Sequence, residues 1–191
     1  MKGYSVKPEI DLLQRLQQNN EGALASLMDM FYADLYNYAA RFTKDDGLIK
    51  DCIQEVFISL WQRRETALTI LSPKYYFLRA IKNKILKAIH RNARKETADD
   101  LLDEYDFFHE FSIEQIIIEK QVSEEKAGKL RKILSLLSIR QKEIIYLKYY
   151  QHLDNGQIAE LMNLSRQSVY NLLHEAIHKL RSLWHTELVA N

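Results

Sequence analysis

The fold is decided by the stretch DNGQIAELMNLSRQSVYNLLHEAIHKL, residues 154–180. Asp154 followed by Gln157 is the pattern of a capping box, in which both side chains satisfy free backbone N–H groups at a helix start. Ser165 marks the start of a second helix, although no Glu or Gln follows it three residues later. Between the two helices, Asn163 can take the left-handed backbone conformation that a sharp turn requires. The stretch therefore predicts two helices joined by a tight turn.

The spacing of Ala159, Asn163 and Val169 indicates which kind of turn this is. A small residue where two helices touch, a turn residue and then a β-branched core residue are typical of a helix-turn-helix. A further helix start is predicted upstream, where Ser138 and Gln141 have the capping-box pattern as well. The C-terminal part of the chain is therefore predicted to be a helical domain that places one helix against duplex DNA.

The last predicted helix has two chemically different sides. Its apolar side, which is spaced to pack on a core, consists of Val169, Leu172, Leu173, Ala176, Ile177 and Leu180. Its polar side and its N-terminal end consist of Arg166, Gln167, Ser168, Tyr170, Asn171 and His174. Because Arg pairs well with guanine edges and Asn or Gln with adenine edges, we predict that these six residues contact the base edges of a DNA site. The alternative is an ordinary solvated face.

The same helix carries the zinc-protease pattern H-E-x-x-H at residues 174–178. Catalytic zinc needs a third protein ligand and an open coordination position. The extended pattern would have Gly at position 181 and His at position 184, where this sequence has Arg181 and Trp184. We therefore expect no metal site, no cofactor and no enzymatic activity.

The composition excludes several classes of protein. Five Gly and two Pro among 191 residues leave few tight turns, so an all-α fold is expected. No apolar run reaches the roughly 18 to 20 residues that span a bilayer, and the N-terminus has no secretory pattern, so we expect a cytoplasmic protein without direct membrane insertion. Cys52 is the only cysteine, which excludes an intramolecular disulfide and favours a small buried side chain over a reactive thiol.

Charge is strongly segregated along the chain, although the net charge is only +1. Residues 66–95 contain no acid, and their basic residues are Lys74, Arg79, Lys82, Lys84, Lys87, Arg91, Arg94 and Lys95. Residues 96–118 contain no Lys or Arg, and their acidic residues are Glu96, Asp99, Asp100, Asp103, Glu104, Asp106, Glu110 and Glu114. The basic block can neutralise phosphates, whereas the acidic block is typical of a solvated spacer.

Apolar periodicity and capping residues divide the chain into two helical domains and a linker. In the first domain, helices are predicted over residues 24–42, from after Asp45-Asp46-Gly47 to Trp61, and from Ser72-Pro73 onward. The boundaries that follow are a first helical domain at residues 9–95, an acidic linker at 96–112 and a second helical domain at 113–186. The predicted architecture is thus all-α, with two domains.

Three stretches resemble one known family when they are taken together and in this order. DCIQEVFISLW, residues 51–61, resembles the D-x-x-Q-E-x-F-x-x-x-W signature of bacterial sigma factors of the sigma-70 family. SPKYYFLRAIKN, residues 72–83, resembles the promoter-contacting helix that follows in those proteins, in sigma region 2. Residues 137–181 resemble the helix-turn-helix of sigma region 4, which implies that the DNA element read by the six polar residues of the last helix is the minus 35 element of a promoter. With two domains and a short linker, the chain is similar to the extracytoplasmic-function (ECF) group.

The resemblance implies roles for particular residues. Asp51, Gln54 and Glu55 share one side of a predicted helix, and in the family this side docks on the clamp helices of the largest catalytic subunit of RNA polymerase. Without the resemblance, the same acidic cluster would be read as solvated surface. The minus 10 element would face Lys74, Tyr75, Arg79, Lys82 and Asn83, where cations meet phosphates and aromatic rings can stack on unpaired bases. The 62–71 loop would hold an extruded base.

The acidic linker would thread the RNA channel of the polymerase, where its negative charge suits a basic channel. The predicted function is that of an alternative sigma factor, which binds core RNA polymerase and promoter DNA and directs transcription initiation. Members of the group are often held by an anti-sigma factor, although no residue here indicates one. The alternative function is that of a helix-turn-helix regulator that binds an operator without polymerase, and the 51–61 motif argues against it.

Overall fold

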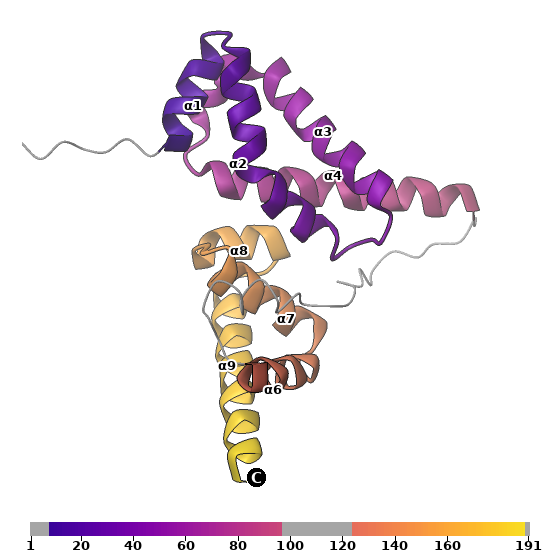
Figure 1. Cartoon of the computed structure of the whole chain (residues 1–191), viewed down its shortest axis with the longest axis vertical. Coiled ribbons are helices and arrows are strands. Elements are labelled where there is room, and N and C mark those ends of the chain that lie inside the picture. Colours follow the sequence, from indigo (N-terminus) through magenta and orange to yellow (C-terminus); the bar gives the residue numbers. More distant parts are fainter. Residues whose placement is uncertain (1–7, 97–123, 190–191) are drawn as a thin grey trace, which may run out of the picture. The chain divides into compact units, whose positions relative to one another are not determined.

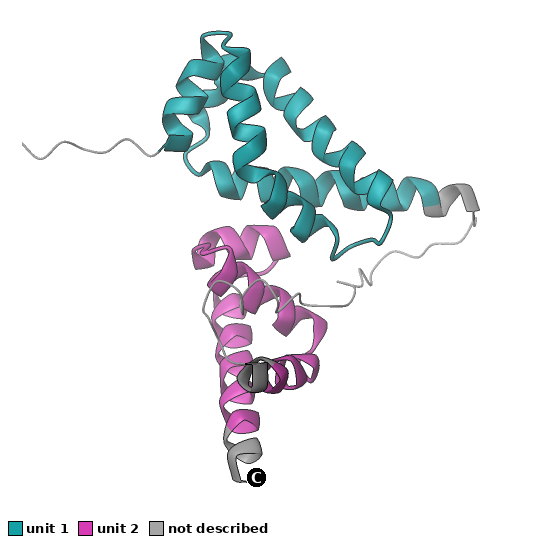
Figure 2. Ribbon diagram, in the orientation of Figure 1, with its two compact units in different colours: residues 1–105 teal, residues 106–191 magenta. Residues whose placement is uncertain are grey.

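The computed structural model describes residues 8–96 and 124–189 of the chain (Figure 1). Within these two ranges the regular structure is helical and contains no strand, which confirms the predicted all-α fold. The chain divides into two compact units, residues 1–105 and 106–191, which are described separately below (Figure 2). Apart from Glu96, the predicted acidic linker lies outside the described residues. The predicted domain boundaries stay predictions.

The described part of unit 1 consists of α1 (Pro8–Gln17), α2 (Glu21–Ala39), α3 (Asp46–Gln62), the short 3-10 helix η1 (Arg64–Thr69) and α4 (Pro73–Glu96). The helix starts follow capping chemistry. The Asn20 side chain accepts a hydrogen bond from the Ala23 N–H at the start of α2, and the Asp45 side chain accepts one from Leu48 at the start of α3. The three helices predicted here are present as α2, α3 and α4, with shifted bounds: α2 ends at Ala39 and not at Phe42, and α3 begins at Asp46, before the predicted start after Gly47, and ends one residue beyond Trp61.

The core of unit 1 forms where α2, α3 and α4 pack on one another. Phe77 of α4 is fully buried, and its ring centroid lies 4.7 Å from that of Phe31 on α2 and 5.1 Å from that of Phe57 on α3. This aromatic cluster fixes the position of α4 against both neighbours. Helix α1 packs on α2 and on η1 and completes the unit. Cys52 is buried in α3, as expected, and burial raises the pKa of its thiol.

The described part of unit 2 consists of α6 (Glu124–Ser135), α7 (Ile139–Ile145), the π-helical turn η2 (Tyr146–Tyr150), α8 (Asn155–Met162) and α9 (Arg166–Val189). Both predicted capping boxes are present, with Ser138 paired to Gln141 and Asp154 paired to Gln157. Helix α9 contacts α6, α7 and α8, so it is the element around which the unit is built. No helix in the described ranges is long and apolar enough to cross a membrane.

Candidate functional site

The turn between α8 and α9 has the geometry of a helix-turn-helix. Asn163 ends α8 in the left-handed conformation, with φ 50° and ψ 48°. The chain then reverses, and the Leu164 N–H donates to the Ala159 carbonyl at 2.9 Å. The Ser165 hydroxyl accepts a hydrogen bond from the Ser168 N–H at 3.0 Å and thereby caps α9. The predicted turn residue, cap and helix-turn-helix are therefore confirmed as structure.

Helix α9 presents its predicted polar side to solvent. Val169 and Ala176 on its apolar side are fully buried, which holds the opposite side outward. The six residues predicted to contact minus 35 DNA are all exposed and comprise Arg166, Gln167, Ser168, Tyr170, Asn171 and His174. Gln167 donates to the Asn171 side-chain oxygen at 2.9 Å, so two amides form a connected hydrogen-bonding edge. Such an edge can meet the donors and acceptors of a base pair.

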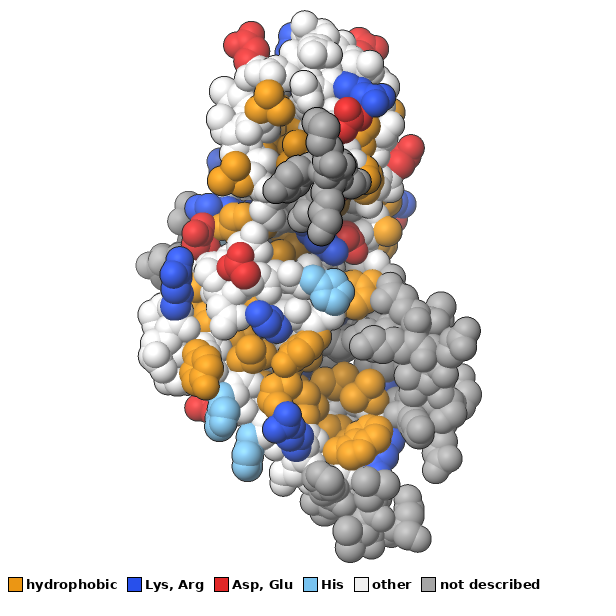
Figure 3. Space-filling model, turned by 90° about the vertical axis from the view of Figure 1, so that its left-hand side faces the viewer, with side chains coloured by type: hydrophobic (Ala, Val, Ile, Leu, Met, Phe, Trp, Pro, Cys, Tyr) orange, Lys and Arg blue, Asp and Glu red, His pale blue; other side chains and the backbone are white. Residues whose placement is uncertain are grey.

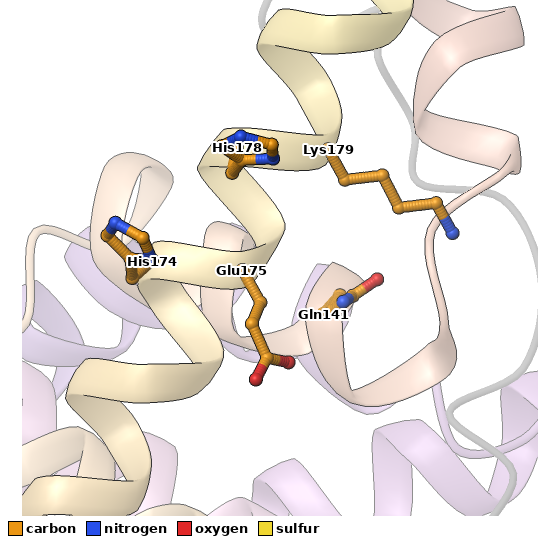
Figure 4. A pocket seen from close by; sticks show the side chains of 5 residues that line it. All are labelled: Gln141, His174, Glu175, His178 and Lys179. Carbon is orange, nitrogen blue, oxygen red and sulfur yellow. The ribbon is translucent and has the colours of Figure 1, made fainter.

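Figure 4 shows how the H-E-x-x-H residues lie on α9. The rings of His174 and His178 stack with centroids 6.5 Å apart, whereas the Glu175 side chain extends from a different side of α9 and lines a pocket with Gln141 of α7. Among the described residues, no cluster of three His, Cys, Asp or Glu side chains could hold a metal ion. Lys179 donates to the Leu136 carbonyl at 2.6 Å and so ties α9 to the segment that follows α6. Together with Gln141, these side chains line a shallow pocket that includes His174, one of the predicted DNA-contacting residues.

Helix α4 brings four of the five predicted minus 10 residues to one side. Tyr75, Arg79, Lys82 and Asn83 follow the spacing of a single helix face. Arg79 and Asn83 are exposed, and Arg79 donates to the Tyr75 hydroxyl at 3.2 Å. The Lys82 ammonium lies 5.7 Å from the centroid of the Phe42 ring. This side therefore combines cations with an aromatic ring, as contact with an unpaired strand requires.

Lys74, the fifth predicted minus 10 residue, lies apart from the other four. Its ammonium forms an ion pair with Asp34 of α2, with a nitrogen to oxygen distance of 3.1 Å. Both side chains are half-buried, at 35% and 28% exposed, so the pair also joins α4 to α2. Sequence reasoning missed Asp34, and no local pattern could have found it because the two residues meet only after the helices pack.

Helix α3 places the predicted docking residues Asp51, Gln54 and Glu55 on one exposed side. Ile58 follows them at the same helical spacing and is 46% exposed, although it is apolar. Ile58 therefore adds apolar area to the side of α3 that carries the predicted docking residues. Sequence reasoning missed Ile58, which the spacing of residues 51, 54, 55 and 58 could have revealed.

Two further groups of exposed apolar side chains were not predicted. The segment expected to be a loop at 62–71 contains the short helix η1, after which Leu71 is 91% exposed. In unit 2, Leu136, Ile139 and Tyr149 are more than two-fifths exposed. Figure 3 shows hydrophobic, basic and histidine side chains gathered on the surface of this unit. Both units therefore have exposed apolar side chains that are not packed in their cores.

Two family models match the chain, one in each unit. The model described as Sigma-70 region 2 matches residues 27–95, which include α3 and the basic part of α4. The model described as Sigma-70, region 4 matches residues 127–180, which include the helix-turn-helix. Together the two matched ranges cover more than half of the 191 residues.

Two curated relatives are ECF RNA polymerase sigma factors. SigK of Mycolicibacterium vanbaalenii is 20% identical over 177 residues, which cover 92% of this chain and 89% of SigK. SigL of Mycobacterium tuberculosis is 24% identical over 163 residues, which cover 83% of this chain and 86% of SigL. Both similarities extend across the two units.

Two solved structures share the fold. CnrH, in complex with the cytosolic domain of CnrY, is 18% identical with a TM-score of 0.53 and covers 94% of this chain and 99% of its own. The sigma factor RpoE of Bartonella quintana, in complex with the anti-sigma factor NepR, is 14% identical with a TM-score of 0.53 and covers 83% of this chain and 94% of its own. With both region models matched in the order that the sequence motifs predict, the chain belongs to the sigma-70 family of RNA polymerase sigma factors, in its extracytoplasmic-function group.

Proposed function

We propose that this alternative sigma factor divides promoter recognition among three helix faces. The α3 side with Asp51, Gln54 and Glu55 docks on core RNA polymerase. The α4 side with its cations and aromatic ring contacts the minus 10 element, and the exposed polar side of α9 reads the minus 35 element. The protein performs no chemical step of its own, requires no metal or cofactor, and works in the cytoplasm where the polymerase and the promoter are found.

The observation that carries the proposal is the exposed polar side of α9, the helix that follows the left-handed turn at Asn163. A recognition helix must be held by its apolar side while its N-terminal polar residues stay accessible to the major groove. Val169 and Ala176 are fully buried, while Arg166, Gln167 and Asn171 are exposed at the N-terminal end. Arg166 would pair with guanine, and the linked Gln167 and Asn171 amides with adenine.

The α4 side suits single-stranded rather than duplex DNA. Tyr75 offers a ring for base stacking, while Arg79 and Lys82 offer cations for phosphates. Asn83 lies next to them and is exposed, so its amide can bond to a base edge. Leu71 is almost fully exposed just before α4, in the segment proposed to hold an extruded base.

The docking surface of α3 combines acidic, amide and apolar groups. Asp51 and Glu55 offer carboxylates to cations of the polymerase, and Ile58 supplies apolar area beside them. We include Ile58 in the proposed docking surface, since a mixed surface binds more tightly than exposed charges alone. A third proposed partner is an anti-sigma factor, because a solved structure with the same fold is of a sigma factor bound to NepR.

Run-off transcription with purified core polymerase tests the proposal. Genomic fragments bound by the reconstituted holoenzyme would serve as templates, and we expect transcripts that start at fixed positions only when the chain is added. Glu55→Ala should weaken co-purification with core polymerase, while Lys50→Ala, which removes an exposed charge elsewhere on α3, should not. Transcript levels no higher than with core polymerase alone would contradict the proposal.

A further inference from the structure

Helix α4 carries a second set of basic residues that is separate from the proposed minus 10 side. Lys84, Lys87 and Arg91 follow one another at spacings of three and four residues, so they form a stripe along one side of the helix. Lys87 and Arg91 are exposed, and Lys84 is half-buried. Within the stripe, Lys84 reaches α3 through its ion pair with Glu55, whereas Lys74 reaches α2.

Lys84 is the point where this stripe meets the proposed docking surface. Its ammonium nitrogen lies 3.0 Å from a carboxylate oxygen of Glu55. The Glu55 side chain is 61% exposed and that of Lys84 is 29% exposed, so a partner can reach the carboxylate from solvent. Burial raises the pKa of nearby Cys52, the Glu55 charge raises it further, and the Lys84 and Arg91 charges lower it, so each of the three charges lies within electrostatic reach of Cys52.

Glu55 and Lys84 can therefore either pair with each other or bind separate partners. Glu55 is needed as an anion for the polymerase, and Lys84 belongs to a helix whose other cations are proposed to bind DNA. A lysine held by a carboxylate is a poor phosphate ligand, because phosphate must first displace the carboxylate. A cation of the polymerase that binds Glu55 would remove that competitor.

We infer that Lys84 is an additional DNA-phosphate contact that Glu55 occupies in the free protein and that polymerase docking releases. The inference rests on the proposed docking role of Glu55. The coupling works in both directions, because DNA that captures Lys84 also leaves Glu55 available to the polymerase. Since exposed ion pairs are weak, the expected coupling is about two- to fivefold in affinity.

Binding of the full-length chain to a mixed-sequence single-stranded DNA oligonucleotide, followed by fluorescence anisotropy over a range of salt concentrations, tests the inference. Glu55→Gln should raise the affinity of the free protein about two- to fivefold and steepen its salt dependence by roughly 0.7 in slope, the value for one added phosphate contact. Asp46→Asn is the matched control, because it removes an acid from another exposed ion pair of the same helix without touching Lys84.

The decisive variant is Lys84→Gln. In that background, Glu55→Gln should give no gain in DNA affinity beyond that of Asp46→Asn. In the assembled holoenzyme, Lys84→Gln should weaken binding of the same DNA. Glu55→Gln should no longer strengthen DNA binding there, when the polymerase concentration is high enough to restore assembly. Thermal unfolding checks that the variants fold, which the exposure of both side chains favours.

The outcomes separate this inference from the proposed function. A gain from Glu55→Gln that persists with Lys84→Gln, or that equals the gain from Asp46→Asn, would overturn the inference and leave docking by α3 intact. Unchanged core affinity of Glu55→Gln would instead contradict the docking role and remove the basis for release. If Lys84 only ties two helices together, Lys84→Gln will lower the unfolding temperature without changing the salt slope, which also overturns the inference.

Discussion

Helices α4 and α9 are the two helices proposed to contact DNA, and their polar side chains are held in different ways. On α9, Gln167 bonds to Asn171 and Ser168 bonds to the Ser165 cap, so these contacts stay within the helix and its cap. On α4, Lys74 pairs with α2 and Lys84 pairs with α3. The α9 contacts therefore need no second helix, whereas Lys74 and Lys84 of α4 must leave a carboxylate on another helix before they can bind phosphate. This difference suits a helix that reads intact duplex and one that engages a strand only when it opens.

The largest expected effect comes from breaking the packing that positions α4. Phe77→Ala should cost about 3–5 kcal/mol of the stability of unit 1, because the ring is fully buried between Phe31 and Phe57. Denaturant unfolding followed by Trp61 fluorescence, in a Trp184→Phe background, measures unit 1 alone. Leu68→Ala, at a 46% exposed position, is the control and should change little. A loss of stability equal in both variants would show that the aromatic cluster does not hold α4.

The next effect separates the two units by function. Asn171→Ala or Arg166→Ala should each weaken binding of the holoenzyme to its minus 35 duplex by about 1–3 kcal/mol if the side chain contacts a base. Anisotropy with a duplex selected by the wild-type holoenzyme measures this. Gln54→Ala removes a comparable amide from α3, and should lower core affinity without changing duplex affinity once the holoenzyme is assembled. The reverse pattern would exchange the roles assigned to the two helices.

A smaller effect concerns the turn that orients α9. Asn163 has a φ of 50°, and the left-handed conformation costs roughly 1–2 kcal/mol for residues with a Cβ that lack the local bonding of Asn. Asn163→Ala should therefore lower the stability of unit 2, while Asn163→Gly should preserve or raise it. Unfolding followed by Trp184 fluorescence, in a Trp61→Phe background, measures the change. Equal stability of the Ala and Gly variants would mean that the turn relaxes and does not fix α9.

Capping and periodicity made much of this architecture predictable from the sequence. A capping box depends on residues three positions apart, so Ser138 and Asp154 could be identified without any tertiary information. The same holds for Asn163, whose short polar side chain tolerates the left-handed turn. The exposed side of α9 followed from the helical period once Val169 was assigned to the core.

The pairings between helices were not predictable in this way. Asp34 meets Lys74, and Glu55 meets Lys84, only because α2, α3 and α4 pack in one particular register. The π-helical turn at Tyr146–Tyr150 was also missed, since its stability involves a buried bond from Gln151 to the Tyr146 hydroxyl that no periodicity indicates. The polar residues of α4 were therefore assigned correctly to a helix, while their partners in the free protein were not foreseen.

The smallest expected effect measures what an exposed ion pair of this kind contributes. The pKa of Asp46 is lowered by its hydrogen bonds, first to Lys50 and then to Tyr36, so the ionised carboxylate stabilises the folded state. This contribution is fully present above the ordinary pKa of 3.8 and is lost as pH falls through the lowered value.

Asp46→Asn should therefore be slightly less stable than the wild type at neutral pH, and the difference in unfolding temperature should disappear on acidification. Tyr36→Phe keeps the carboxylate and should show a smaller difference. A difference in unfolding temperature that grows toward low pH would contradict a stabilising role of the ionised Asp46 carboxylate. If the neutral-pH difference is small, the partly exposed ion pair between Lys84 and Glu55 can open at little cost, as the exchange of partners proposed for Lys84 requires.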